Sequence, residues 1–336
     1  MNGWIKLAIS ACVLAVVYFG FDGHAAITLL GDMRLEYLLL AVAPGAPIFA
    51  LGAWRWQRIA RINGVRLRFR TSLRVTTESH FFNQGLPSTL GGVAYRIWIL
   101  TRQNVPASDA VGCVVTDRVS GVMALSLLVA RGQFWLVDYR ADTAARLAVW
   151  FVVGIVVVAI ALADALGRLL ARRERGPVFS RLAQSIGHLK ALCDAPMEFA
   201  LVMLIGLVGH SLLAMIFFTL AVGLDVPVTA AQALMIFPTV FLLSMMPITV
   251  AGWGVREALL ITALKLFGVS SAAAVALGLP FRTCMMIISI PGAILWPLER
   301  EPGVCMPSVG GAGWPPRATL AAQAGAIPDH APGRDA

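Results

Sequence analysis

The chain is dominated by long apolar runs that are separated by short polar connections. Six runs are long enough to cross roughly 30 Å of hydrocarbon as helices; they cover residues 4–21, 35–54, 108–130, 145–166, 197–222 and 271–297. The first run contains only Lys6 near its start and no small-residue cleavage site follows it, so we interpret it as a retained span rather than a signal peptide. The pattern predicts six transmembrane helices.

Two further apolar stretches, about 71–101 and about 231–267, are too polar or too interrupted to be full spans. Each has two arms of about 11 to 17 residues that meet at a corner rich in proline and glycine, whereas a span needs about 20 residues. This pattern is typical of a re-entrant helix pair, which enters the bilayer, turns near its middle and leaves on the same side. Non-helical backbone is tolerated at that depth only inside protein or beside a watery cavity. We therefore expect both corners to be buried between the spans.

The two corners repeat one pattern, P-x-T-x-x-G-x-x-x-R. Its fixed positions are Pro87, Thr89, Gly92 and Arg96 in the first copy and Pro247, Thr249, Gly252 and Arg256 in the second. Gly91 and Gly254 add another glycine to each corner, which allows a tight turn and a close backbone approach. An arginine at membrane depth is costly and is by default a functional residue. Paired segments of this kind indicate the binding site of a transporter.

The repeat extends beyond the corners. An offset of 160 residues places the second span on the fifth, and an offset of 164 places Asn104 on Gly268 and Arg118 on Arg282. Each half is thus a span, a re-entrant pair and a second span. Because the fourth span separates the halves, the second copy begins on the opposite side of the membrane, which makes an inverted repeat. We expect a site at the midplane that opens alternately to either face.

The composition agrees with a membrane protein, since 58% of the residues are hydrophobic, 13% are charged and the mean hydropathy is +0.79. Residues 1–298 are predicted to form one membrane domain, with repeat halves at about 35–130 and 197–297. Residues 299–336 are rich in proline, glycine and alanine and are predicted to be a disordered cytoplasmic tail. The predicted fold is an all-α integral membrane protein with six transmembrane helices and two re-entrant helix pairs in an inverted repeat.

The basic residues predict the orientation in the cell's inner membrane. Arginines concentrate in 55–74 and 168–190, which should be cytoplasmic by the positive-inside rule, with 131–143 external and both termini cytoplasmic. The net charge of +9 then reflects topology and attraction to anionic headgroups. No nucleic-acid-binding pattern accompanies it, so no nucleic acid partner is expected.

Arginines outnumber acids within the apolar part of the chain. The set is Arg96, Arg118, Arg256 and Arg282 against Asp117 and Glu257. Adjacent residues point to different sides of a helix, so Asp117 and Arg118 each need a partner elsewhere. A phosphate is the natural complement, because arginine presents a planar fork to it and a helix start offers free N–H groups. We predict that Arg96 and Arg256 bind a lipid phosphate, supported by the other two arginines and oriented by the two acids.

Structural roles remain open for several of these residues. Arginines near helix ends can reach an interface, and intramembrane acids can lock helices together. For Arg118 and Arg282 the two roles stand equal, whereas the repeated prolines and glycines favour binding for Arg96 and Arg256. Asn83 either contacts the lipid or satisfies broken backbone.

Several kinds of site have no signature in the chain. The five cysteines are scattered without a C-x-x-C pair, which predicts neither a disulfide framework nor a metal site. No P-loop, G-x-S-x-G or H-E-x-x-H pattern occurs. We therefore predict no catalytic residue, no cofactor and no coupling to ATP. His210 is expected to be a packed, hydrogen-bonded residue of the fifth span.

Together these residues resemble a known family. Residues 81–92 with Arg96, the Asp117-Arg118 pair and residues 247–257 are similar to the transmembrane, flippase-like half of lysylphosphatidylglycerol synthase, and the resemblance covers about 4–297. In the bifunctional synthases this half moves aminoacylated phosphatidylglycerol between leaflets, and free-standing relatives are associated with hopanoid and dolichol-linked pathways. The resemblance implies the moving half without the synthetic half. Many relatives carry an acid where this chain has Val93, which puts a proton- or cation-linked role at that position in doubt.

The sequence thus predicts a transporter or flippase for an anionic lipid: a phospholipid, a polyprenyl phosphate or a hopanoid-type lipid. The alternative from a different class is a non-transporting accessory subunit that recruits a lipid or glycolipid biosynthetic enzyme through its basic cytoplasmic loops. A membrane-embedded transferase ranks third, because no clustered base and nucleophile accompany the apolar segments. The partners expected are the membrane, an anionic lipid and, under the alternative, that enzyme.

Overall fold

The computed structural model describes residues 28, 31, 33–85, 91–135, 150, 154, 187–244 and 255–298. These residues form helices and their connections, with no strand among them, which agrees with the predicted all-α class. Apart from residues 150 and 154, the predicted first and fourth spans lie outside the described residues. The predicted tail, 299–336, lies outside them as well.

Four of the six predicted spans are confirmed as helices long and apolar enough to cross a membrane, so the chain is a multi-pass membrane protein. They are Leu35–Ile62, Ala107–Gly132, Pro196–Gly223 and Ser271–Pro297. The first consists of α3 (Leu35–Val42) and α4 (Gly45–Ile62), and the others belong to α7 (Ala107–Trp135), α10 (Pro196–Gly223) and α13 (Ser271–Leu298).

The second predicted span, 35–54, is confirmed as a span, but the structure differs from its predicted course in two respects. The helix is interrupted at Ala43 and Pro44, where the missing N–H of proline ends the hydrogen-bond ladder. It then continues to Ile62, well past residue 54. The first arginines of the predicted cytoplasmic segment 55–74 therefore lie on a helix. Their charges are tolerated there because acids on other helices pair with them, as Glu198 does with Arg58 at 2.9 Å.

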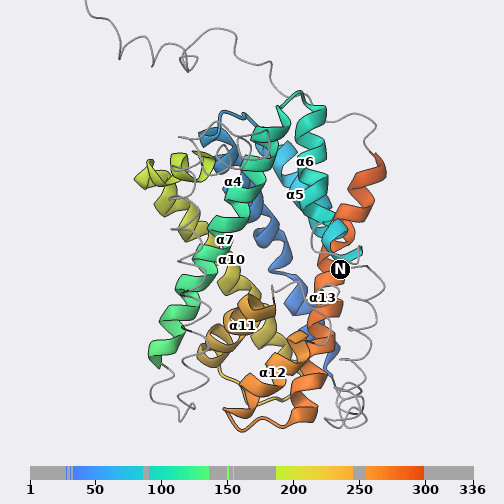
Figure 1. The fold of residues 1–336 in the computed structure, drawn as a ribbon. Helices are drawn as coiled ribbons and strands as arrows, with labels where there is room; N and C mark the ends of the chain where they lie inside the picture. Colours follow the sequence, from blue (N-terminus) through green and yellow to red (C-terminus); the bar gives the residue numbers. More distant parts are fainter. Residues whose placement is uncertain are drawn as a thin grey trace, which may run out of the picture. The chain divides into compact units, whose positions relative to one another are not determined.

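Four shorter helices form the predicted arms: α5 (Phe69–Gly85), α6 (Gly91–Arg102), α11 (Ala230–Ser244) and α12 (Val255–Lys265). They contain 17, 12, 15 and 11 residues, so the predicted arm lengths are confirmed. At a rise of 1.5 Å per residue they measure only about 17–26 Å. Helix α5 packs on α6 and α11 packs on α12, with one pair near the top of Figure 1 and the other near its bottom.

The turns at the centre of the two predicted corners lie outside the described residues. This holds for Pro87, Thr89, Pro247, Thr249, Gly252 and Gly254, whereas Gly91 and Gly92 open α6. The re-entrant path through the bilayer therefore remains a prediction.

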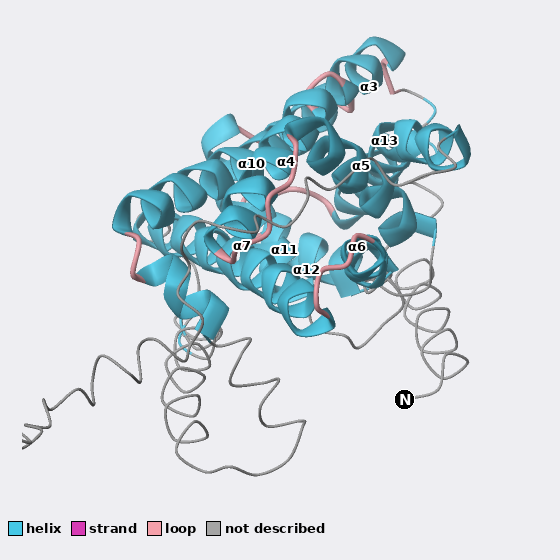
Figure 2. Cartoon of the chain, turned by 90° about the horizontal axis from the view of Figure 1, so that it is seen from above, coloured by secondary structure: helices cyan, strands magenta, loops and turns pink. Residues whose placement is uncertain are grey.

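Helix packing follows the predicted repeat. Helix α4 contacts α5 and α7 as α10 contacts α11 and α13, and α6 packs on α7 as α12 packs on α13. The contacts between the halves also correspond to each other under the predicted repeat: α5 packs on α13, and its counterpart α11 packs on α7. Figure 2, seen from above, shows the helices of both halves intermixed. Each short helix pair is therefore held by a long helix of the other half.

Four of the described helices end with the same turn, which agrees with the predicted repeat. A residue just past the helix end has a positive φ, at Gly64 (80°), Asn104 (59°), Asp225 (51°) and Gly268 (77°). In each case the next residue is a valine whose N–H donates to the carbonyl five residues earlier, at 2.8 Å for Val65, 3.1 Å for Val105, 2.9 Å for Val226 and 3.2 Å for Val269. This is the Schellman motif. The sequence offset of 164 had placed Asn104 on Gly268.

Glycines set the close contacts between long and short helices. A Cβ on Gly292 of α13 would collide with the backbone of Thr77 in α5. A Cβ on Gly45 of α4 would lie 2.8 Å from Cγ1 of Ile288 in α13. Small residues at such positions let membrane helices approach closely and gain dispersion contacts. The packing around the polar site is therefore tight.

Candidate functional site

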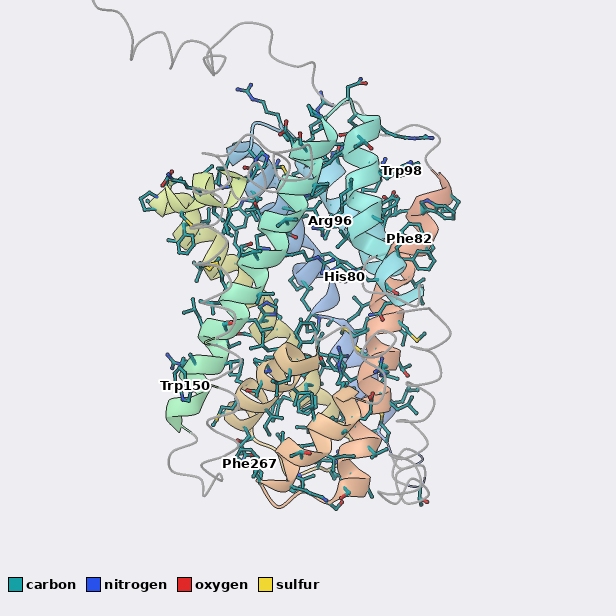
Figure 3. The ribbon with its side chains drawn as sticks, in the orientation of Figure 1. His80, Phe82, Arg96, Trp98, Trp150 and Phe267 are labelled. Carbon is teal, nitrogen blue, oxygen red and sulfur yellow. The ribbon has the colours of Figure 1, made fainter. Side chains whose placement is uncertain are left out.

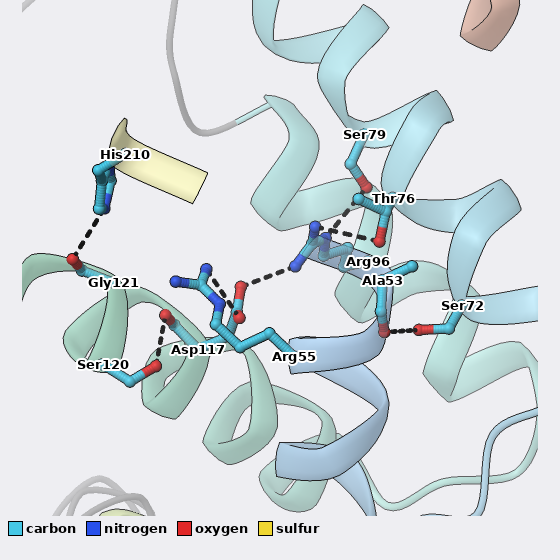
Figure 4. A network of polar contacts seen from close by, with 10 residues as sticks. All are labelled: Ala53, Arg55, Ser72, Thr76, Ser79, Arg96, Asp117, Ser120, Gly121 and His210. Atoms are coloured by element: carbon cyan, nitrogen blue, oxygen red, sulfur yellow. Dashed lines mark hydrogen bonds and ion pairs between the residues drawn. The ribbon is translucent and has the colours of Figure 1, made fainter. Parts of the chain in front are cut away.

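A buried carboxylate held by two guanidiniums lies where α4, α6 and α7 meet (Figure 4). Nη1 of Arg96 donates to Oδ2 of Asp117 at 2.8 Å, and Nη2 of Arg55 lies 3.0 Å from Oδ1 of the same carboxylate. Arg96 and Asp117 are only 7% and 3% exposed. A buried charge is costly unless it is paired; Arg96 pairs with and hydrogen-bonds to Asp117, and Arg55 adds a second ion pair to the same carboxylate.

The guanidinium of Arg96 is contacted on its other sides by α5 and α4. Its Nε donates to Oγ of Ser79 at 3.3 Å and its Nη2 to Oγ1 of Thr76 at 3.5 Å. Its Cζ lies 4.9 Å from the centre of the Trp56 ring, within the range of a cation–π interaction. Figure 3 shows Arg96 and His80 between the helices. Arg96, which α6 carries, is therefore held in one position by contacts with three other helices, α4, α5 and α7.

A second buried carboxylate lies next to this network. Glu78 is 1% exposed and accepts a hydrogen bond from the Tyr95 hydroxyl at 2.6 Å. Its other oxygen lies 3.5 Å from Nε of Arg74, one helical turn earlier. Tyr95 and Arg96 are adjacent on α6, and Glu78 and Ser79 are adjacent on α5. Two neighbouring hydrogen bonds, Tyr95 to Glu78 and Arg96 to Ser79, thus join α6 to α5.

The second half holds its charges differently. Nε of Arg282 in α13 donates to Oε1 of Glu257 in α12 at 2.9 Å, and both side chains are about nine-tenths buried, at 11% and 9% exposure. The Cζ of Arg256 lies 5.5 Å from the Phe241 ring centre and 5.8 Å from that of Phe281. Within the described part of the chain, its buried Nε has no hydrogen-bond partner. Aromatic rings, not a carboxylate, surround this guanidinium.

The two halves form their ion pairs at different positions of the repeat. Arg96 corresponds to Arg256, and Arg118 corresponds to Arg282. In the first half the arginine of the short helix is paired with an acid of the long helix, whereas in the second half the arginine of the long helix is paired with an acid of the short helix. Among the described residues, neither exposed Arg118 nor Arg256 has a carboxylate within ion-pair distance. Within the described ranges, one arginine per half thus has no carboxylate in an ion pair with it.

His210 of α10 lies between the two sites. Its Nε2 is 3.1 Å from the carbonyl oxygen of Gly121 in α7 and must donate to it, and its ring centre is 6.1 Å from that of Phe241. The expectation of a packed, hydrogen-bonded histidine is confirmed. The residue connects the helix that carries Asp117 with the rings beneath Arg256.

The sequence also matches a known family. The description of that family is lysylphosphatidylglycerol synthase TM region, and the match covers residues 3–292. The chain belongs to this family. None of the curated proteins matches it in sequence. The match spans both repeat halves of this synthase TM region and includes every arginine described above, so the predicted resemblance is confirmed.

The predicted site residues fall into two groups in this TM region. Arg96, Asp117 and Arg118 belong to the first half, and Arg256, Glu257 and Arg282 belong to the second. Asp117 orients Arg96 as expected, but Glu257 contacts Arg282 rather than its neighbour Arg256. Their binding of a lipid remains a prediction.

Of the two roles that the sequence left open for Asn83, contact with the lipid or a hydrogen bond to broken backbone, the structure shows the hydrogen bond to backbone. Its Oδ1 accepts a hydrogen bond from the backbone N–H of Gly92 at 2.9 Å, at the start of α6. A Cβ on Gly92 would collide with the carbonyl oxygen of Ser79. The asparagine and the glycine thus join the two arms of the first pair next to the corner.

Sequence reasoning missed several members of the network. Arg55 was counted as a loop residue, and Trp56, Thr76 and Ser79 were not considered; Glu78 and Tyr95 were not paired. One signal was present: Ser72, Thr76 and Ser79 are spaced by four and three residues, which places them on one face of α5. Ser72 donates to the carbonyl of Ala53 at 2.7 Å. A polar stripe inside an apolar helix pair indicates a buried polar contact.

No metal centre is formed by the described residues, which contain no group of three or more histidine, cysteine, aspartate or glutamate side chains placed to hold an ion. The chemistry available is that of guanidinium groups in apolar surroundings. Such groups bind anions through charge-assisted, bidentate hydrogen bonds.

Proposed function

We propose that this protein moves an anionic lipid across the cell's inner membrane and that its arginines hold the lipid phosphate during transfer. The lipid is a phospholipid, a polyprenyl phosphate or a hopanoid-type lipid. Under this proposal both termini lie in the cytoplasm, and the two helix pairs enter the membrane from opposite faces. The inverted repeat supports this proposal, because a symmetric pair of sites can be opened alternately to either side.

The observation that carries the proposal is the unneutralised arginine in each half. An isolated charge inside a membrane protein is costly and marks a substrate pathway. Arg118 and Arg256 have no carboxylate partner among the described residues, although acids neutralise Arg96 and Arg282 nearby. A phosphate oxygen pair fits the planar fork of arginine and would supply the missing charge. Arg96 and Arg282 would then support binding from the adjacent ion pairs.

The test is transbilayer movement of labelled phosphatidylglycerol and of labelled polyprenyl phosphate in proteoliposomes. Losing one charge-assisted contact should cost about 1.5–3 kcal/mol, so Arg256→Ala and Arg118→Ala should each weaken lipid binding by at least about tenfold. Arg256→Lys and Arg118→Lys should retain only part of the wild-type affinity for the lipid, because lysine lacks the planar fork of arginine. Arg34→Ala serves as the control, since Arg34 forms an exposed ion pair with Asp225 outside the site.

A second candidate function rests on the exposed basic stretch between α4 and α5. Arg61, Arg66, Arg68 and Arg70 are all exposed there. An accessory subunit could use this stretch to recruit a lipid or glycolipid biosynthetic enzyme. Wild-type protein that moves every lipid no faster than empty liposomes would favour this reading. Full movement by the Arg118/Arg256 double alanine variant would show that these arginines do not bind the transported lipid.

A further inference from the structure

Each half of the protein contains the same three-residue arrangement around its acid. Asp117 precedes Arg118 and pairs with Arg96, and Glu257 follows Arg256 and pairs with Arg282. In both halves the acid is thus the chain neighbour of the unneutralised arginine and the ion-pair partner of the other. In the second half, Arg256 also contacts the ring of Phe281, the chain neighbour of Arg282, so an anion that reaches Arg256 arrives near the ion pair.

We propose that Asp117 and Glu257 are internal counter-ions that compete with the lipid phosphate: each carboxylate holds an arginine in the empty site and releases it when the phosphate binds. This inference rests on the proposed function. The acids are positioning residues, because they act through the arginines. A carboxylate and a phosphate offer the same kind of oxygen pair to a guanidinium. The exchange gives the released guanidinium a new anionic partner in an apolar environment, where an uncompensated buried charge is strongly unfavourable.

The contacts of Asp117 allow such an exchange without leaving it unpaired. Its Oδ1 faces Arg55 at 3.0 Å and its Oδ2 faces Arg96 at 2.8 Å. When Arg96 turns to a phosphate, Arg55 still neutralises the carboxylate. In the second half, a Cβ built on Gly278 would lie 3.5 Å from Cγ of Glu257, an ordinary contact. The first half can thus accommodate the change with its carboxylate still paired.

The proposal differs measurably from a purely structural role for the acids. If the carboxylates compete with phosphate, removing one frees an arginine and tightens anion binding. It also slows release, because nothing displaces the phosphate afterwards. If the acids only join helices, their removal loosens the site and cannot tighten binding. The sign of the affinity change therefore decides between the two roles.

The experiment uses the full chain in nanodiscs with short-chain phosphatidylglycerol, farnesyl phosphate and inorganic phosphate as separate probes. Glu257→Gln and Asp117→Asn should each lower the dissociation constant for the lipid probes about tenfold, as expected for one added charge-assisted contact, and should slow lipid movement. Glu198→Gln is the control, because Glu198 pairs with Arg58 away from the site. Binding of inorganic phosphate as tight as that of the lipid probes would identify free phosphate as the ligand.

The possible outcomes separate the two proposals. Wild-type protein that neither binds nor moves any lipid overturns the proposed function and this inference with it. Wild-type protein that does both, with variants that bind no tighter, overturns the counter-ion role alone. If both variants unfold during purification, they are prepared again with phosphatidylglycerol present throughout. Recovery of folded protein then supports the competition, and failure to recover indicates that the carboxylates are structural.

Discussion

The two halves of the molecule place arginines at the same repeat positions but stabilise them by different physics. In the first half, hydroxyl groups and a carboxylate surround Arg96, whereas phenylalanine rings surround its counterpart Arg256. The repeat offsets place Thr76 on Ile236 and Asp117 on Phe281. The repeat thus preserves where a guanidinium lies, not how it is held. We expect the first half to be the more rigid one and the second to be the more available to a ligand.

The largest contrast should appear when these two arginines are removed. Arg96→Ala leaves Asp117 paired with Arg55 alone and removes a charge-assisted hydrogen bond, which should lower the free energy of unfolding by about 1.5–3 kcal/mol. Arg256→Ala removes only cation–π contacts and should cost about 1 kcal/mol. Unfolding in detergent micelles by titration with dodecyl sulfate measures both, with Arg34→Ala as an exposed reference. Equal losses would contradict the proposed difference between the halves.

A second contrast concerns the two interfaces between the halves. Gly292 of α13 meets backbone of α5, so Gly292→Ala should force the helices apart and cost about 1–3 kcal/mol. In the mirror interface, a Cβ on Gly132 of α7 would lie 3.5 Å from Cα of Met235, an ordinary contact. Gly132→Ala should therefore change the free energy of unfolding by less than about 0.5 kcal/mol. Thermal unfolding of both variants tests this; a large loss for Gly132→Ala would show that both interfaces are equally tight.

A smaller effect should follow from removing one hydroxyl of the first half. Tyr95→Phe leaves an oxygen of buried Glu78 without its 2.6 Å hydrogen bond and should cost about 1–2 kcal/mol. Tyr37→Phe is the matched control, since the ring of Tyr37 covers Gly223 outside this network. Comparing the two midpoints of thermal unfolding isolates the contribution of the hydrogen bond. A pair of equal midpoints would mean that Glu78 is satisfied without Tyr95.

The smallest effects should come from the turns that end α6 and α12. Gly268 has a φ of 77°, so Gly268→Ala should cost about 1 kcal/mol. Its counterpart Asn104 has a φ of 59°, and Asn104→Gly should change the free energy of unfolding by at most a few tenths of a kcal/mol, or about 0.3. Chemical unfolding of both variants tests whether the two halves share this turn. A neutral Gly268→Ala would argue against it.

Hydropathy and motif spacing were sufficient for much of the fold. Four spans, the lengths of the four short helices and the repeat relation between Asn104 and Gly268 were predicted and confirmed. The break at Pro44 and the extension to Ile62 were missed. Hydropathy measures transfer of a side chain to hydrocarbon, so it ends a span at Arg55. Hydropathy contains no information about tertiary contacts, and here Asp117, more than sixty residues later, neutralises Arg55 inside the protein.

The composition of the candidate site was predictable, but its pairing was not. The excess of arginine over acid, the repeat of Arg96 in Arg256 and the family resemblance all follow from the sequence, because each depends on residue type and spacing along the chain. Tertiary structure alone decided that Asp117 binds Arg96 and Arg55, that Glu257 binds Arg282, and that no carboxylate in the described part of the chain pairs with Arg118 or Arg256. Ion pairs form between side chains within about 4 Å of each other. That proximity is set by how the helices within each half pack on one another, as α6 packs on α7 and α12 on α13, which residue spacing does not encode.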